Sequence, residues 1–162
     1  MEAHEIPMAV QWHEGMLLSP HHFQQSSLRQ EGLVHYHASL ANPYGWGVRR
    51  LRFDPVLLPN GTLRVLELEA IMPDGLVVWH QAGGAAELTI DLKPHMEGRA
   101  SASLTVQLAV PGQRAPAEPF AGTLARWASA EGDPVHDENT GDNPIAVPRL
   151  VPRVALIVGE TG

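Results

Sequence analysis

Residues 63–80 read LRVLELEAIM-PDG-LVVWH, so two apolar-rich segments flank a proline, an aspartate and a glycine. Pro-Asp-Gly is a typical turn sequence, because each of these residues favours a turn conformation. The flanking segments are rich in residues that suit a pleated, half-buried surface. The stretch therefore predicts a β-hairpin with strands over residues 63–72 and 76–80. Apolar–polar alternation slips near Val65 and Leu66, which predicts a bulge, or burial on both faces of the first strand.

Short strand-like segments continue on both sides of this hairpin. Residues 86–92 and 104–110 alternate between apolar and polar side chains, the pattern of a strand buried on one face. The 15 glycines and 14 prolines of the chain favour frequent turns over long helices. Repeated short strands separated by turns predict a mainly β chain, built as a sandwich or a barrel, with Trp79 and Trp127 in its core. The other predicted strands cover residues 48–53, 124–130, 145–147 and 154–158.

One helix precedes these strands. Ser19 is a typical helix N-cap, and Pro20 fits the first helical position because its missing N–H would have no partner there. The Asn-Pro pair at residues 42–43 ends the pattern, since the residue before a proline avoids helical geometry. The sequence thus predicts a helix over residues 20–41, packed on one face of the β structure or closing one end of it. Its apolar stripe consists of Phe23, Leu33, Tyr36 and Leu40.

Composition excludes several classes of protein. The chain has no cysteine, which rules out disulfides, thiolate metal sites and cysteine nucleophiles. Its formal net charge is -7, so it lacks the basic footprint of a nucleic-acid-binding protein. The first residues are acidic and no apolar run is long enough to cross a bilayer, so we expect a cytoplasmic chain. We expect residues 1–162 to form a single domain of a longer protein, because the chain stops soon after an apolar strand.

Candidate catalytic and metal-binding patterns are weak. His21 and His22 are adjacent, and no two histidines have the i, i+4 spacing of a helical metal site. No serine lies in the glycine-flanked turn of a nucleophile elbow. Glu67 and Glu69 fit a solvent-facing row of one strand. We therefore predict no metal, no cofactor and no enzymatic activity, and a hydrolase whose catalytic residues meet only on folding stays the open alternative.

The acidic loop at residues 133–142 leaves two interpretations open. Its Asp, Glu and Asn oxygens are suitable calcium ligands. The spacing departs from an EF-hand loop, because the glycine is fifth when counted from Asp137 and no distal glutamate follows. The alternative is a turn in which Asp and Asn side chains accept hydrogen bonds from their own backbone.

The densest motif is VQWHEGMLLSPHHFQQ, residues 10–25. It resembles the N-terminal signature of the TssK family, the adaptor of the bacterial type VI secretion baseplate. Two further segments are similar to the family in order and spacing: YGWG at residues 44–47, and DENTG at residues 137–141 with IAV at residues 145–147. The matching positions of the first motif are Val10, Trp12, Glu14, Gly15, Met16, Leu17, Leu18, Pro20, His22, Phe23, Gln24 and Gln25.

The resemblance implies a fold and a role. The chain would be the family's N-terminal shoulder domain, a β-sandwich with one N-terminal α-helix, similar to the shoulder domains of siphophage receptor-binding proteins. In the family this domain docks onto the baseplate wedge proteins TssF and TssG, and the full-length protein forms a trimer. The resemblance therefore implies a non-enzymatic structural adaptor without a cofactor, whose shoulder domain contacts neither nucleic acid nor the membrane.

We expect the opening motif to lie at the partner interface. Trp12 sits beside charged residues, where it would either pack over the helix start or serve as an interface anchor. Leu17, by contrast, is expected in the core. The predicted partner-binding residues are Trp12, Glu14, Gly15, Met16, Pro20, His22 and Phe23.

A carbohydrate- or receptor-binding β-sandwich is the alternative function. A sugar site needs exposed aromatic side chains beside polar ones, and Tyr44 and Trp46 near Arg49 fit that description. The solvent exposure of these aromatic rings distinguishes the two candidate functions. An aromatic platform open to solvent favours sugar binding, whereas a buried Trp46 favours the adaptor.

Overall fold

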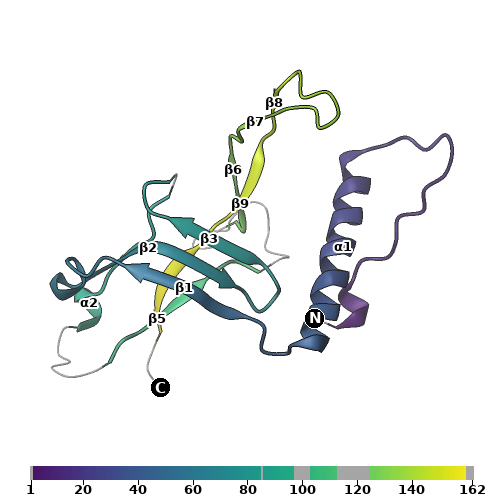
Figure 1. Ribbon diagram of the computed structural model, residues 1–162. Helices are drawn as coiled ribbons and strands as arrows, with labels where there is room; N and C mark the ends of the chain where they lie inside the picture. Colours follow the sequence, from purple (N-terminus) through teal and green to yellow (C-terminus); the bar gives the residue numbers. More distant parts are fainter. Residues whose placement is uncertain (1, 85, 97–102, 113–124, 160–162) are drawn as a thin grey trace. The chain divides into compact units, whose positions relative to one another are not determined.

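The computed structural model describes residues 2–84, 86–96, 103–112 and 125–159 (Figure 1). The fold is mainly β, with one long helix near the N-terminus and several antiparallel sheets, which confirms the predicted fold class. The packing of those sheets as a sandwich stays a prediction. The chain divides into two compact units, Met1–Arg49 with Glu69–Val77, and Arg50–Leu68 with Val78–Gly162.

Helix α1 spans Pro20–Ala41, the range that the sequence indicates. It begins after Ser19, whose extended backbone (φ −134°, ψ 160°) precedes the proline at the first helical position. Gly32 is the buried residue of this helix. Of the predicted apolar stripe, Phe23 and Leu40 are exposed, and Leu33 and Tyr36 are half-buried.

A four-stranded sheet contains the predicted hairpin. Its strands are β1 (Gly47–Phe53), β2 (Thr62–Ile71), β3 (Val77–Gln81) and β4 (Thr89–Asp91). The order is β1-β2-β3, and β4 also pairs with β2. At the hairpin turn the Met72 N–H donates to the Leu76 carbonyl over 2.8 Å, and Gly75 has a positive φ of 85° that glycine adopts without strain. Strand β4 is antiparallel to the start of β2 and covers only part of the predicted strand over residues 86–92.

The buried side chains of the second unit come from these strands and from the segment around β4. Val65, Leu68 and Val78 are at most 2% exposed, and Leu88 and Leu92 are also buried. Val65 and Leu68 lie three residues apart, so strict alternation fails within β2. The slip that the sequence predicts in this strand is thereby confirmed.

Two tryptophans expected in the core are solvent-exposed instead. Trp79 is 66% exposed because the preceding residue, Val78, takes the buried face of β3 and successive side chains alternate. Trp127 is 37% exposed and begins β6 (Trp127–Ala130). The Arg126 guanidinium lies 5.5 Å from the centre of the Trp127 ring. Burial alternates along β6 from Trp127 onward, exposed and then half-buried, so this ring lies on the exposed face of its strand.

The remaining described strands form two-stranded antiparallel ladders. The sequence did not predict β7 or β9, because the prolines at 134, 148 and 152 favour loops. A two-stranded ladder tolerates proline, since one edge of each strand makes no ladder hydrogen bonds. Residue 124 of the predicted strand over 124–130 lies outside the described residues. The pairs are β5 (Thr105–Ala109) with β10 (Ala155–Gly159), β6 with β9 (Arg149–Pro152), and β7 (Pro134–Val135) with β8 (Ile145–Ala146).

Three short helical turns complete the described chain. A single helical turn occupies the start of the segment after β4. The turns are η1 (Ala3–Glu5), η2 (Leu58–Asn60) and α2 (Lys93–Met96).

Candidate functional site

The N-terminal segment, residues 7–19, runs back along helix α1 in the direction opposite to it (Figure 1). Two contacts hold it there. The Arg29 guanidinium donates a hydrogen bond from Nη1 to the Pro7 carbonyl over 2.8 Å. The Trp12 ring lies 6.1 Å from the His22 ring and 6.0 Å from the Phe23 ring, measured between centroids. Segment and helix therefore form one local structure within the first unit.

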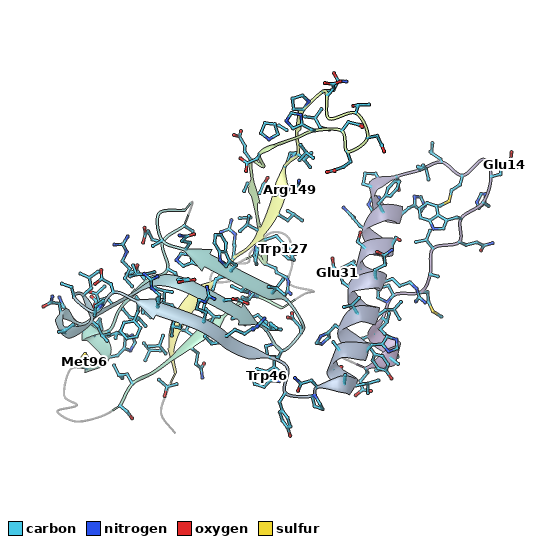
Figure 2. All side chains as sticks on the ribbon, in the orientation of Figure 1. Glu14, Glu31, Trp46, Met96, Trp127 and Arg149 are labelled. Carbon is cyan, nitrogen blue, oxygen red and sulfur yellow. The ribbon has the colours of Figure 1, made fainter. Side chains whose placement is uncertain are left out.

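The tip of the N-terminal segment is a tight turn. The Met16 N–H donates to the His13 carbonyl over 3.3 Å. Gly15 has a φ of 78°, in the left-handed region that favours glycine, which explains this residue in the motif. The Glu14 side chain extends from the turn into solvent (Figure 2). A glycine turn thus presents a carboxylate at the far end of the segment.

His22 organises the start of the helix. The Ser19 N–H donates to His22 Nδ1 over 3.1 Å, and Ser19 Oγ lies 3.1 Å from the same nitrogen. This is a capping box in which a histidine takes the place usually held by glutamate or glutamine. Acceptance of the backbone N–H by Nδ1 requires the tautomer whose proton is on Nε2.

The predicted interface residues gather around this segment and helix start, and most of them are exposed. Trp12 is 50% exposed although it contacts two aromatic rings, so it packs over the helix start and still offers half its surface. The expectation for Leu17 is wrong: it is 89% exposed, because the turn at Gly15 carries it away from the helix. Glu14, Gly15, Pro20 and Phe23 are exposed, and Met16 and His22 are half-buried.

Sequence reasoning missed the contribution of Arg29. It lies outside the predicted apolar stripe of the helix, yet its side chain donates a hydrogen bond to a backbone carbonyl 22 residues earlier. No local sequence pattern predicts this hydrogen bond, because its donor and acceptor meet only when the N-terminal segment folds back along the helix. Met8, 87% exposed, and Leu18 add apolar surface to the same segment.

The carboxylates considered for catalysis are engaged with arginines. Arg50 Nη1 lies 2.8 Å from Glu67 Oε1, and Arg52 Nη1 lies 3.4 Å from Oε2 of the same carboxylate. Glu69 pairs with Arg49 over 3.3 Å. The hydrogen bond from Arg50 holds the pKa of Glu67 below its ordinary value. A carboxylate stabilised in its charged form is a poor general acid, so this cluster suits a structural role.

The acidic loop forms the predicted turn around Asp137. Asp137 Oδ1 accepts hydrogen bonds from the backbone N–H groups of Asn139, over 2.8 Å, and Thr140, over 3.0 Å. These donors lower the pKa of the Asp137 carboxyl. His136 Nδ1 donates to the Gly141 carbonyl over 2.9 Å. The turn interpretation of this loop is confirmed, and the loop with neighbouring residues of β6 and β9 borders an open pocket of about 730 Å³.

The aromatic pair considered for sugar binding is open to solvent. Tyr44 is 87% exposed and Trp46 is 56% exposed. Trp46, labelled in Figure 2, lies just before β1. Arg49 follows within that strand. Exposure at this position agrees with the carbohydrate alternative. Trp12 and Trp79 are exposed to a similar degree, so an exposed aromatic ring is a common feature of this chain.

Comparisons with known proteins identify relatives in bacterial type VI secretion. The family model described as "Bacterial Type VI secretion, VC_A0110, EvfL, ImpJ, VasE" matches residues 22–161. The type VI secretion system baseplate component TssK1 of Pseudomonas aeruginosa is 39% identical over 66 residues, which are 41% of this chain and 15% of that protein. The N-terminal segment lies outside the matched residues of the family model.

Solved structures agree with the family match. A crystal structure of TssK is 27% identical, with a TM-score of 0.77, over 96% of this chain and 36% of that one. A chain of a cryo-electron microscopy structure of the type VI secretion TssK-TssF-TssG baseplate subcomplex has a similar fold, with a TM-score of 0.77 at 22% identity. That match covers 96% of this chain and 52% of the other, so the chain spans about a third to a half of these relatives.

Among the described residues, no helix combines the length and the apolar character needed to span a membrane. The fold, the family model and the relatives lead to one assignment. This chain belongs to the TssK family of type VI secretion baseplate proteins.

Proposed function

We propose that this chain is the shoulder domain of a TssK-type adaptor, a non-enzymatic structural part that docks onto the baseplate wedge proteins TssF and TssG. The observation that carries the proposal is the N-terminal segment, which presents apolar and acidic side chains to solvent. Family membership supports the structural role, and a relative's structure is named as a complex with TssF and TssG.

The chemistry of the N-terminal segment and of the helix start beside it suits a protein interface. Half-exposed aromatic side chains such as Trp12 and Phe23 resemble the anchors that dominate binding energy at interfaces. Their exposed faces would be buried by a partner without unfolding the segment, because the contact between the rings already exists. Glu14 adds a charge at the tip, where it would steer and orient the partner.

The other proposed residues shape this surface. Gly15 permits the turn, Met16 and Pro20 lie on either side of the exposed leucine pair, and His22 supports the helix start. The adaptor acts in the cytoplasm, and this domain touches neither the membrane nor nucleic acid. In the full-length protein the trimer would display three copies of the segment, and multivalent attachment raises the overall affinity.

Binding to a purified TssF–TssG complex from the same organism tests the proposal. The parent chain should bind saturably, and Trp12→Ala and Glu14→Lys should each weaken binding while circular dichroism shows retained folding. Removing a well-packed interface aromatic weakens binding by about tenfold or more. Glu31→Lys is the matched control, since it makes the same charge change at an exposed helix position away from the tip. Equal binding by all variants would place the interface elsewhere, and absence of binding by the parent would contradict the proposal.

Carbohydrate binding at Tyr44 and Trp46 is the second candidate, favoured by their exposure. Aromatic rings open to solvent can stack against the apolar faces of sugar rings. Titration with a panel of oligosaccharides, followed by nuclear magnetic resonance of the Trp46 indole, tests it. A saturable shift in the parent that Trp46→Ala abolishes would support this candidate, and an unperturbed indole across the panel would reject it.

A further inference from the structure

His22 contacts the N-terminal segment and the helix start with different parts of one ring. Its Nδ1 accepts the Ser19 N–H over 3.1 Å, which satisfies a donor at the helix terminus. Its ring lies 6.1 Å from the Trp12 ring at an interplanar angle of 51°. Such a tilted arrangement falls within the range of favourable aromatic pairs. One side chain therefore links the cap of α1 to the aromatic residue of the segment.

Arg29 makes the second link, two turns further along the helix. Its Nη1 donates to the Pro7 carbonyl over 2.8 Å, and the side chain is half-buried. A charged donor strengthens the hydrogen bond to a backbone carbonyl. Pro7 and Trp12 are thus attached to the helix at separate points, and the turn at Gly15 closes the segment beyond them.

We infer that His22 and Arg29 are positioning residues, which hold the N-terminal segment against α1 so that its tip meets a partner as a preformed loop. This inference rests on the proposed function in taking the tip as the element that binds. A preformed loop loses less conformational freedom on binding than a free one, so its contacts yield more affinity. His22 thereby acts on binding through Trp12 as well as through the helix cap.

Two substitutions separate the two roles of His22. His22→Gln keeps a side-chain acceptor at the capping-box position and removes the ring. His22→Phe keeps a ring beside Trp12 and removes the acceptor. A residue that merely supported the helix would respond to the loss of the acceptor alone.

The measurements are the melting temperature of the 162-residue chain and hydrogen exchange of the amides in residues 8–18. His22→Gln should leave the melting temperature near that of the parent and speed exchange of the segment by about two- to tenfold, the effect of losing one aromatic pair. His22→Phe should lower the melting temperature by a few degrees and leave exchange near the segment's centre unchanged. The Trp12 indole resonance, assigned with Trp12→Phe, should move in His22→Gln and stay in place in His22→Phe.

Arg29 is tested in the same way. Arg29→Gln should speed amide exchange at residues 8–10, which follow Pro7. Arg29→Lys should restore part of the protection because it keeps a charged donor, and Glu31→Gln is the control on the neighbouring exposed face. Affinity for the TssF–TssG complex should fall in His22→Gln and Arg29→Gln in proportion to the faster exchange.

Each outcome has a clear meaning. Unchanged exchange in both His22→Gln and Arg29→Gln would overturn the inference, as would faster exchange of the segment without loss of affinity. Absence of binding by the parent chain would contradict the proposed function, and the exchange measurements would still show whether the two residues position the segment.

Discussion

Gly75 at the β2–β3 turn lies directly against the ring of His35 on α1, so a side chain at this position would collide with it. A Cβ built on Gly75 would contact His35 Nδ1 and lie 2.8 Å from Cγ of that ring. Both residues belong to the first unit, so this close approach joins the hairpin turn to the helix within that unit. The glycine also has a φ of 85°. This position therefore requires glycine for two reasons, the lack of space beside the His35 ring and the left-handed backbone conformation.

Gly75→Ala should destabilise the protein by more than the backbone strain alone. A residue other than glycine in the left-handed region costs about 1–2 kcal/mol, and the collision with His35 adds to it. Thermal unfolding measures the effect, with a fall of about 2–4 °C expected for each 1 kcal/mol. Gly83→Ala is the matched control, because Gly83 has a φ of 88° and open space around its Cβ position. Equal losses in the two variants would contradict the role assigned to His35.

Glu67 should titrate below the ordinary range of a glutamate. The Arg50 hydrogen bond favours its charged form, so the folded-state pKa is lowered relative to the unfolded chain. Its contribution to stability is therefore present above the unfolded-state pKa and is lost as the pH falls through the folded-state value. Carbon-detected nuclear magnetic resonance of the side-chain carboxyl measures the midpoint. Arg50→Gln should move the midpoint upward, and an unmoved midpoint would show that the ion pair does not form in solution.

Asp137 should control the order of the loop between β7 and β8. Asp137→Ala removes the acceptor of two backbone N–H groups, so amides 138–142 should exchange faster. Asp137→Asn keeps the Oδ1 acceptor and should retain most of the protection. The lowered pKa of Asp137 predicts that protection in the parent weakens when the pH falls through that folded-state value. Identical exchange in the alanine and asparagine variants would refute this account of the turn.

Gly15 should tolerate asparagine better than alanine. Its φ of 78° is accessible to asparagine at lower cost than to alanine, and no atom lies within 4 Å of its Cβ position. Gly15→Ala should therefore strain the turn by about 1–2 kcal/mol through the backbone alone. The amide chemical shifts of residues 13–17 should change strongly in the alanine variant and weakly in the asparagine variant. The opposite ranking would mean that the tip does not hold the left-handed turn in solution.

Features coded by local sequence were predictable. The helix start at Ser19, the hairpin turn at residues 73–75 and the Asp137 turn depend on backbone preferences within a few residues, and the structure has each of them. Strand β9 escaped prediction because Pro152 within it and Pro148 just before it oppose strand formation, and only the pairing with β6 overrides that preference.

Features that depend on distant contacts were not predictable. Leu17 has the apolar side chain of a core residue, and its exposure follows from a turn that no hydrophobic pattern reports. Arg29 contacts Pro7 across 22 residues, and a single sequence contains no signal for that pairing. The motif around Trp12 was informative because it resembles a family, and the ring contacts behind it became visible only in the structure.

Strand β1 stands at one end of its sheet order, and it carries exposed Leu51 and Phe53. An end strand of this kind has backbone N–H and C=O groups that can pair with a strand of another chain, which is the first step of aggregation. The three arginines at positions 49, 50 and 52 oppose that step, because charged side chains along an edge repel a second copy of the same edge. Their ion pairs with Glu67 and Glu69 on β2 fix these charged side chains beside the strand, so a second copy of the edge could pair with it only by displacing or desolvating them.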